Sequence, residues 1–458
     1  MGHPSVENDM TKTILVGCGA GFANDRPDAA LRLAQDLAQR GGQRYIMLEL
    51  LAERTLAEAQ LRKRLDPQAG YSARLFDFLE PMLDVCIEAG IPIITNGGAA
   101  NPRAAAQRLR QTLAGRFPAL KIACVLGDDL LEETPPRYER WLSSEPLEPP
   151  VSVNVYTGAD GIAQALAEGA GIVLCGRVAD PSLAVGAIRH GLGWSADDWQ
   201  KMAIATTAGH LLECCTQVTG GYFAHPGMKD VPDPANLGCP IAEVHQDGRL
   251  IIGKTGNCGG RVSEQTVKEQ LLYEVHDPRR YLTPDVVLDL GQARVQELGD
   301  DRVEISGLLG HPRPDTLKGL AGVRGLWFGE AEISYAGPGA MARAALAREI
   351  LLQRFDQLAP GAQPWIDLSG VASLFNDQGG RYLQQQLAQA PALEDVRVRI
   401  GLTHTDRRLV EALLAEVESL YTNGPAGGGG VRRHLAETVT TRSFLLPRDE
   451  IHTTLEWY

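Results

Sequence analysis

The chain has 458 residues, a formal net charge of -13 at pH 7 and 50 glycines. Its length predicts two or three domains, because single hydrophobic cores stop growing at about 250 to 300 residues. The acidic balance and the lack of a Lys/Arg block exclude partners that need a basic surface, so we expect neither nucleic acid nor a membrane as partner. The N-terminus has no apolar signal core, and no run approaches the about 18 apolar residues of a spanning helix, which predicts a cytoplasmic protein.

Short apolar runs alternate with amphipathic stretches through the first half of the chain. Alternation of this kind predicts parallel strands crossed by helices, and strands that are apolar throughout predict a sheet covered on both faces. We therefore predict an α/β ligand-binding domain over residues 11–275, with an open, mostly parallel sheet and helices on both faces. The strand-like runs are TILVG, RYIMLEL, IPIITN, KIACVLG, VSVNVY and GIVLCG, and the first helices are expected at about Pro27 to Arg40 and about Ser72 to Ala89.

The pattern of apolar and polar residues changes in the second half of the chain. From about Ser195 to Leu272 we expect one long helix, a loop-rich segment and a return helix, together lying over the strand ends. Beyond that, runs such as DRVEISG and GLWFGEAEISY are typical of antiparallel strands, and two good helices are expected near Met341 to Phe355 and Asp406 to Tyr421. These patterns predict a smaller α+β domain over residues 280–458.

The opening run TILVGCGAGF is typical of the first strand and turn of a dinucleotide-binding domain. A pyrophosphate turn needs glycine at its first, third and sixth positions, and here Gly17 and Gly19 are followed by Phe22 at the sixth. The loop also contains Asp25, whose charge would repel a phosphate. We interpret the segment as a ligand loop, predict no cofactor, and keep a nicotinamide oxidoreductase only as a third hypothesis.

Polar side chains and glycines follow several predicted strands at the point where each ends. Ligands bind beyond the carboxyl ends of strands in open parallel sheets, so these turns form the expected site. Each turn taken alone is explained by helix capping, but together their arginines and amide-rich glycine turns favour a small anion, either a carboxylate or a phosphate-bearing carrier. The residues are Asn24, Asp25, Arg26, Asn96, Gly97, Gly98, Asn101, Arg103, Asp128, Arg177 and Asp180.

The segment AGHLLECC carries a second candidate. On a helix, His210 and Glu213 lie three residues apart on one face, the spacing of an imidazole–carboxylate pair. The eight cysteines form no CxxC pair, and we predict no metal site. A partly buried histidine held by a helical hydrogen bond is the structural alternative, and an acid/base role stays open.

The segment LYTNGPAGGGGVRR is the third candidate. A flexible linker is its simplest interpretation, but it stands between a regular helix and a strand-like run. A backbone-amide cradle for an anion, made by Gly427 and Gly428 with Arg432, or a close contact between domains, is the more fitting use.

Seven motifs together resemble the acyclic terpene utilization AtuA family, from about Thr13 to about Pro447. They are GFANDRPDAA, TNGGAANPRAAA, CGRVADPSL, HLLECCTQVTGGYF, KEQLLYEVHDPRRYLTPDV, EISYAGPGA and LYTNGPAGGGGVRR. The resemblance implies a role in breakdown of citronellol and geraniol through branched acyl-CoA intermediates, and it supplies no catalytic residues. Longer relatives carry an additional C-terminal region, so an activity that needs it would require a small partner chain here.

These observations support an enzyme as the first hypothesis. It would catalyse a lyase- or hydratase-like step on a branched carboxylate or on its CoA thioester, the CoA serving as substrate carrier. His210 and Glu213, or Asp25 and Asp128, would move a proton, while arginines and glycine turns hold the anion. The alternative is a non-catalytic subunit that binds an acyl-CoA or organises a partner enzyme in a catabolic complex. A homo-oligomer is expected in either case.

Overall fold

The computed structural model describes residues 12–113, 115–131, 137–141, 149–389 and 393–458. Two compact units divide the chain. Unit 1 comprises Met1–Gly322 and Thr441–Tyr458, and unit 2 comprises Val323–Thr440. Unit 2 is therefore inserted into the sequence of unit 1, whose last residues follow it.

The centre of unit 1 is a sheet of parallel strands in the order β1-β2-β3-β6-β4. Their side chains are buried almost throughout, as expected for strands covered on both faces. The α/β fold and its parallel centre, predicted from the alternating runs, are confirmed, except that the run VSVNVY lies outside this sheet and pairs antiparallel with another strand. The strands are β1 (Thr13–Ala20), β2 (Gln43–Leu48), β3 (Ile93–Thr95), β6 (Ile172–Cys175) and β4 (Ile122–Leu126).

Antiparallel strands extend this sheet at both edges. On the β1 side the order continues β7-β8-β12-β11, and on the other side the C-terminal strand β18 pairs with β4. The sheet is therefore mixed, with a parallel centre and antiparallel flanks. These strands are β7 (Pro240–His245), β8 (Leu250–Lys254), β12 (Arg302–Ser306), β11 (Arg294–Gly299) and β18 (Thr454–Trp457).

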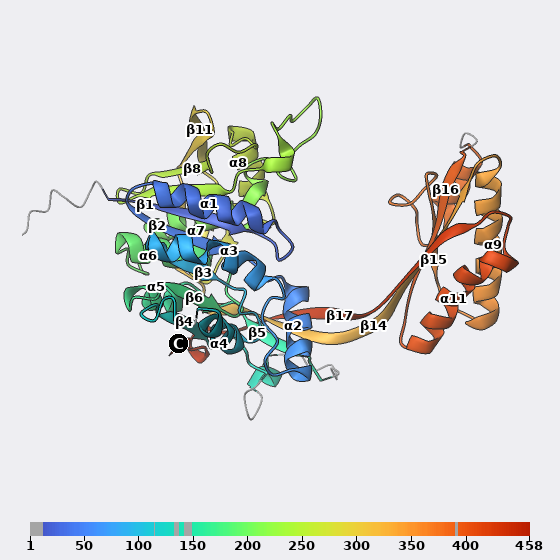
Figure 1. The fold of residues 1–458 in the computed structure, drawn as a ribbon, viewed down its shortest axis with the longest axis horizontal. Coiled ribbons are helices and arrows are strands. Elements are labelled where there is room, and N and C mark those ends of the chain that lie inside the picture. Colours follow the sequence, from blue (N-terminus) through green and yellow to red (C-terminus); the bar gives the residue numbers. More distant parts are fainter. Residues whose placement is uncertain (1–11, 114, 132–136, 142–148, 390–392) are drawn as a thin grey trace, which may run out of the picture. The chain divides into compact units, whose positions relative to one another are not determined.

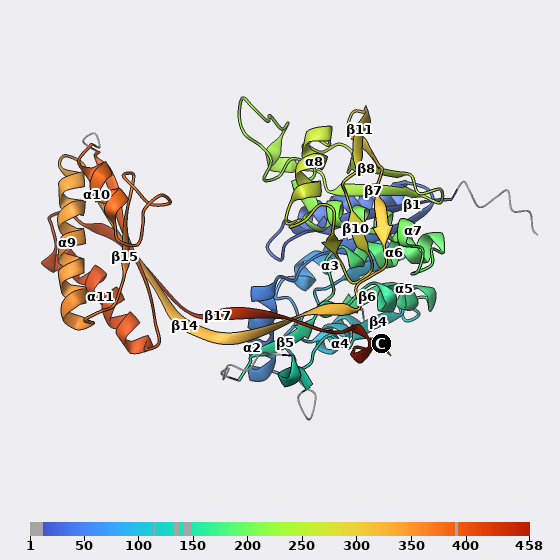
Figure 2. The same ribbon diagram turned by 180° about the vertical axis from the view of Figure 1, so that it is seen from behind.

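Helices cover both faces of the sheet (Figures 1 and 2). The chain steps in one direction from β1 through β2 and β3 to β4, and then returns to β6 and β7. Because such crossovers are right-handed, α1, α3 and α4 share one face and α5, α6 and α7 the other. The helices of unit 1 are α1 (Pro27–Gln39), α2 (Glu53–Leu65), α3 (Leu75–Glu88), α4 (Pro102–Thr112), α5 (Asp160–Ala167), α6 (Ser182–Leu192), α7 (Trp199–Glu213) and α8 (Glu264–Leu272).

Four further strands complete unit 1. A small antiparallel sheet has the order β13-β10-β9, and β5 pairs with β14, which also enters unit 2. The strands are β5 (Ser152–Val155), β9 (Tyr281–Leu282), β10 (Val287–Asp289) and β13 (Leu309–His311).

No helix in the described ranges is long and apolar enough to cross a membrane.

Unit 2 is an α+β unit with its own core. Its antiparallel sheet has the order β15-β16-β14-β17, and buried residues of α9 and α11 form one hydrophobic cluster with it. The smaller α+β region predicted from the sequence is thus present. Its elements are β14 (Thr316–Ala336), α9 (Ala340–Leu358), β15 (Trp365–Ser369), α10 (Arg381–Leu387), β16 (Asp395–His404), α11 (Arg407–Asn423) and β17 (Gly429–Pro447).

The boundary between the units lies further along the chain than residue 280. The predicted position followed the change to antiparallel strands, but β11 and β12 join the sheet of unit 1 through β8.

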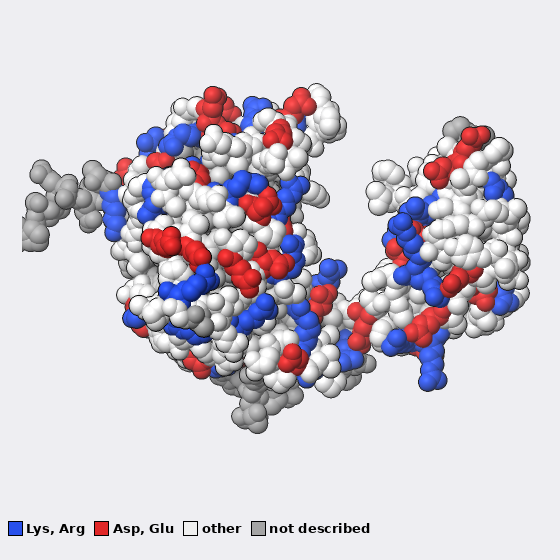
Figure 3. Space-filling model, in the orientation of Figure 1, with Lys and Arg blue, Asp and Glu red and all other residues white. Residues whose placement is uncertain are grey.

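On the face in Figure 3, basic and acidic side chains are interspersed over both units, with no continuous basic surface among the described residues in view.

Candidate functional site

The site is built where the sheet of unit 1 changes winding direction. Strands β3 and β6 are neighbours, and the chain leaves β3 towards α4 on one face and β6 towards α6 on the other. A crevice forms beyond the carboxyl ends of two such strands, and ligands bind there in open α/β sheets. The turns after β3 and β6 come very close, since a Cβ on Gly98 would lie 2.6 Å from the Cys175 carbonyl oxygen.

Arg177 is the buried cation of this crevice. Its side chain is 1% exposed, donates from Nη1 to Leu51 O at 2.8 Å and from Nε to Val178 O at 3.0 Å, and pairs with Asp180. The guanidinium also lies 4.5 Å from the ring centroid of Tyr156. Arg177 therefore holds Asp180 in place, and it is the Asp180 side chain, 35% exposed, that reaches solvent.

A second carboxyl group, Glu49, follows β2 in the same crevice. Its Oε1 accepts hydrogen bonds from Asn96 Nδ2 and from Leu51 N, both at 2.9 Å, while Asn96 Oδ1 accepts one from Leu50 N at 2.7 Å. Burial and the charge of Asp180 raise the pKa of Glu49 well above its usual range, although Arg177 opposes the shift. Asn96 thus joins the ends of β2 and β3 and orients Glu49.

Asp128, which follows β4, supports the turn that carries Arg177. Its Oδ2 accepts hydrogen bonds from Arg177 N at 2.7 Å and from Asn154 Nδ2 at 2.9 Å. Burial, followed by the charge of Asp129, raises the pKa of Asp128 to about 7. It fixes the backbone of the turn that carries Arg177 and Asp180.

His210 and Glu213 form a buried pair at the end of α7. Nδ1 of His210 lies 2.9 Å from Oε1 of Glu213. Burial, with the charge of Asp180 adding to it, raises the pKa of Glu213 to about 7 despite the hydrogen bond from His210. Burial favours neutral His210, but the bond and charge of Glu213, helped by carbonyls of α8, outweigh it and raise the pKa of His210. The pair therefore retains a proton near neutral pH.

Two polar atoms of this pair lack hydrogen-bond partners among the described residues. Glu213 Oε2 is buried and has no hydrogen-bond partner in the described part of the structure. Nε2 of His210 is also buried without a hydrogen bond among the described residues. The backbone carbonyl groups of Gln270 and Leu271 nearby raise the pKa of His210. Proton exchange between Glu213 Oε2 and a ligand therefore stays a prediction.

Two glycines explain why α7 reaches the crevice. A Cβ on Gly209 would lie 2.3 Å from Pro181 O, at the start of α6, and one on Gly21 would lie 2.4 Å from Glu213 O. Both distances are far below any real contact, so only glycine permits this approach. The result is that Glu213, one helical turn after Gly209, is brought beside Asp180.

Tyr281, from the segment after α8, completes the group and was not predicted from the sequence. Its ring packs edge-on against His210, with centroids 5.2 Å apart. Burial raises the pKa of Tyr281, and the charges of Glu213, Asp180 and Glu274 raise it further. We call the set Glu49, Arg177, Asp180, His210, Glu213 and Tyr281 the switch-point cluster.

Among the described residues, no group of three or more His, Cys, Asp or Glu side chains is arranged to hold a metal ion. The cluster contains three carboxyl groups, Glu49, Asp180 and Glu213, and one buried arginine. The charge of Asp180 raises the pKa of both Glu49 and Glu213, which favours their protonated forms.

A family model described as acyclic terpene utilisation family protein AtuA matches residues 14–457. The chain belongs to the AtuA family. The family's name implies a role in acyclic terpene utilisation, and the resemblance read from the seven motifs is confirmed. No curated protein and no solved structure matches the chain.

The other residues predicted at strand ends have local partners. Asp25 Oδ2 accepts a hydrogen bond from Gly21 N at 2.8 Å, and burial raises the pKa of Asp25. Asn24 and Arg26 are exposed, and Arg26 donates to Ala235 O at 2.5 Å. This loop thus holds the turn that packs against α7.

After β3, the predicted residues close the turn. Asn101 caps α4 by accepting from Ala104 N at 3.2 Å, and it donates to Ala69 O at 2.7 Å. A Cβ on Gly97 would lie 2.8 Å from Leu75 Cδ1, so Gly97 allows close packing. Arg103 is directed away from the cluster and binds Glu456 of β18 at 2.7 Å.

The glycine-rich segment belongs to unit 2. Gly427 has φ +72°, and a Cβ on Gly428 would lie 2.9 Å from Ile333 Cδ1. The side chain of Arg432 is 77% exposed, with Nε 3.8 Å from Glu332 Oε1. These residues lie in a different unit from the switch-point cluster, and the anion cradle stays a prediction.

Proposed function

We propose that the chain is a lyase- or hydratase-like enzyme acting on a branched carboxylate, free or as its CoA thioester, in the breakdown of an acyclic terpenoid. The observation that carries the proposal is the environment of the Glu213 carboxyl group. Glu213 is 7% exposed, has one oxygen without a hydrogen-bond partner among the described residues, and has a pKa raised to about 7. A proton-transfer group works best with its pKa near the operating pH.

In the proposed reaction, protonated Glu213 delivers a proton from Oε2 to the carbon next to the substrate carbonyl. Asp180, which is in contact with solvent, takes a proton from the water that adds to the neighbouring carbon. Elimination is the same sequence reversed. His210 is a positioning residue, since its hydrogen bond fixes Glu213 Oε1 and leaves Oε2 for the substrate.

The substrate class rests on the family. The family resemblance implies breakdown of acyclic terpenoids through branched acyl-CoA intermediates, in which a carbonyl would activate the neighbouring carbon. A proton-transfer cluster beyond the strands of an open α/β sheet suits this chemistry, and the family's name supplies the catabolic setting.

The test is turnover of a panel of branched, unsaturated carboxylic acids and their CoA thioesters, followed by mass spectrometry of the products. We expect addition or loss of one water for at least one thioester. Glu213→Gln should lower the rate by about 10²-fold or more, because the general acid is lost. Glu80→Gln, an exposed glutamate on α3, is the matched control and should retain the rate.

Binding without conversion would contradict the enzyme and favour the non-catalytic acyl-CoA-binding subunit. Equal rates for wild type and Glu213→Gln would remove Glu213 from the chemistry. The His210→Asn variant separates positioning from catalysis: it should shift the pH profile of the rate more than it changes the apparent affinity for substrate.

A further inference from the structure

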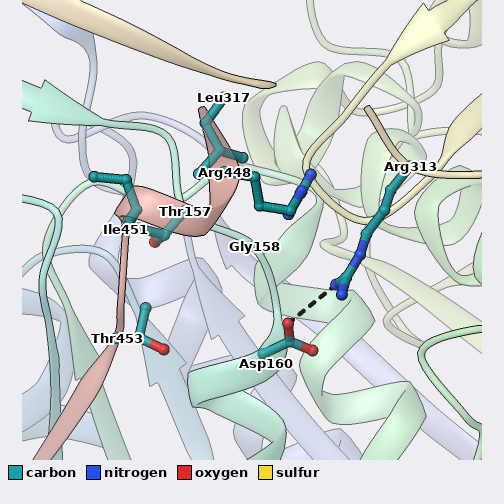
Figure 4. Close-up of a pocket in the computed structure, with 8 residues that line it drawn as sticks. All are labelled: Thr157, Gly158, Asp160, Arg313, Leu317, Arg448, Ile451 and Thr453. Atoms are coloured by element: carbon teal, nitrogen blue, oxygen red, sulfur yellow. Dashed lines mark hydrogen bonds and ion pairs between the residues drawn. The ribbon is translucent and has the colours of Figure 1, made fainter. Parts of the chain in front are cut away.

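A cavity in unit 1 lies beside the turn between β5 and α5. Its volume is about 200 Å³. Arg313 and Arg448 enter it from separate segments of the chain (Figure 4). The other lining residues are Thr157, Gly158, Asp160, Leu317, Ile451 and Thr453. None of them belongs to the switch-point cluster, so the cavity is independent of the proposed reaction.

Arg448 is fixed in place by backbone carbonyl groups. Its Nε donates to Pro314 O at 2.8 Å and its Nη2 donates to Pro284 O at 2.7 Å. Nη1 has no hydrogen-bond partner among the residues that the structure describes. The neutral carbonyls orient this guanidinium without neutralising it, which leaves a fixed positive charge at the cavity.

The acidic groups nearby are already engaged. Asp160 binds Arg189 at 2.6 Å through Oδ1 and Arg313 at 3.2 Å through Oδ2. Asp285 accepts hydrogen bonds from Ala159 N and from the Ser182 hydroxyl. Asp315 is a third acidic neighbour of Arg448, so three arginines face three carboxylates. Arg448 differs from Arg189 and Arg313 because its side-chain hydrogen bonds go to neutral carbonyl groups and not to a carboxylate.

The two guanidinium groups disfavour each other. Burial lowers the pKa of Arg448, and the neighbouring charge of Arg313 lowers it further, although Asp285, Asp160 and Asp315 oppose the shift. An anion between the arginines would relieve this repulsion. Thr453, which follows Arg448 in the C-terminal segment, adds a hydroxyl group to the lining.

We propose that the Arg313–Arg448 cavity binds a phosphate group. Two arginines from separate segments match the oxygens and the double charge of a phosphate better than those of a single carboxylate. The volume is several times the about 30 Å³ share of one water molecule and below the roughly 300 Å³ at which pockets hold a whole organic ligand. The site therefore takes inorganic phosphate or the phosphate end of a larger molecule.

The test is calorimetric titration of the full chain with inorganic phosphate, at constant ionic strength held by chloride. We expect one phosphate bound per chain. Arg313→Gln and Arg448→Gln should each weaken binding roughly 10- to 100-fold, the loss expected for one charged hydrogen-bonding partner. Arg116→Gln, which removes an exposed arginine paired with Asp84 at 2.8 Å, is the control and should bind as wild type does.

Melting curves and circular dichroism establish that the variants fold. If Arg448→Gln fails to fold because Pro284 O and Pro314 O lose their donor, Arg313→Gln alone decides. Absence of binding to wild type at millimolar phosphate, or unchanged binding in Arg313→Gln, would overturn the proposal. Titration with an alkyl phosphate monoester distinguishes the sources: tighter binding than inorganic phosphate assigns the site to a larger ligand, and weaker binding assigns it to the free ion.

Discussion

Asp128 and Glu213 are carboxyl groups whose pKa is raised to about 7 for the same first reason, burial. Their surroundings assign them different roles. Asp128 Oδ2 accepts hydrogen bonds from Arg177 N and Asn154 Nδ2, whereas Glu213 Oε2 has no partner in the described structure. We therefore propose a structural role for Asp128 and proton transfer for Glu213.

The pH dependence of stability tests the assignment of Asp128. Its folded pKa lies above its unfolded value, so the folded state favours the protonated form and loses stability as pH rises from about 4 to 7. The amide introduced by Asp128→Asn does not ionise, so the variant avoids this loss. We expect the free energy of unfolding of the variant to rise relative to that of wild type across that range, by at most about 4 kcal/mol.

Urea denaturation at pH 4.5, 6 and 7.5 measures this difference. Asp84→Asn, at an exposed ion pair with Arg116, is the control and should not show a gain with this sign. A constant difference between Asp128→Asn and wild type over the range would show that burial does not raise this pKa.

At the scale of elements, the position of α7 depends on Gly209. Alanine is the better helix former by about 1 kcal/mol, so propensity alone would make Gly209→Ala stabilising. Its Cβ would, however, lie 2.3 Å from Pro181 O, a backbone atom that cannot move independently of α6. We expect a net loss of about 1–3 kcal/mol in the free energy of unfolding and loss of proton transfer, because α7 is displaced from Asp180.

Gly41→Ala is the matched control, since a Cβ there meets nothing within 4 Å. Thermal melting and a crystal structure of Gly209→Ala measure the two effects. Wild-type stability with an unmoved α7 would show that the contact with α6 tolerates a methyl group.

The parallel centre could be predicted because each of its strands is a continuous apolar run. Helix α1, predicted at about Pro27 to Arg40, spans Pro27–Gln39, since Pro27 marks its first turn. The strands β7 and β8 were missed: their segment is rich in turns and was interpreted as loops over the strand ends. Their pairing with β1 is set by tertiary contact, which local periodicity does not encode.

The candidate site was predictable in part for a similar reason. Strand ends could be located, and the i,i+3 spacing of His210 and Glu213 gives one helix face, so the structure joins that pair as the spacing requires. Asn101 and Arg103 share the same strand-end signal but serve capping and an ion pair with Glu456. Tyr281 comes from a segment far along the chain, with no spacing that relates it to α7.

At the scale of the whole molecule, each unit has its own core. The main cluster of unit 1 extends from Ile14 to Leu308, and the cluster of unit 2 lies entirely within Val323–Thr440. The chain enters and leaves unit 2 along β14 and β17, which are neighbours in one sheet. Thr438 donates to Leu326 O at 2.7 Å, so the two crossing points lie close together.

Replacing residues 323–440 by an Asn-Gly turn should therefore leave unit 1 folded. We expect a single cooperative thermal transition. We also expect the raised pKa of Glu213 to be retained, which isotope-edited infrared spectroscopy of labelled glutamate measures. A chain without a cooperative transition would show that unit 1 depends on unit 2 for its stability.

The central claim is that Glu213 exchanges a proton with a carbon of the substrate. The most direct measurement is mass spectrometry of branched acyl-CoA thioesters incubated with the protein in D₂O. We expect one deuterium at the carbon next to the carbonyl for at least one thioester, with the rate of incorporation falling about 10²-fold or more in Glu213→Gln. Incorporation at an equal rate in Glu213→Gln, or none from any thioester with wild type, would contradict the claim.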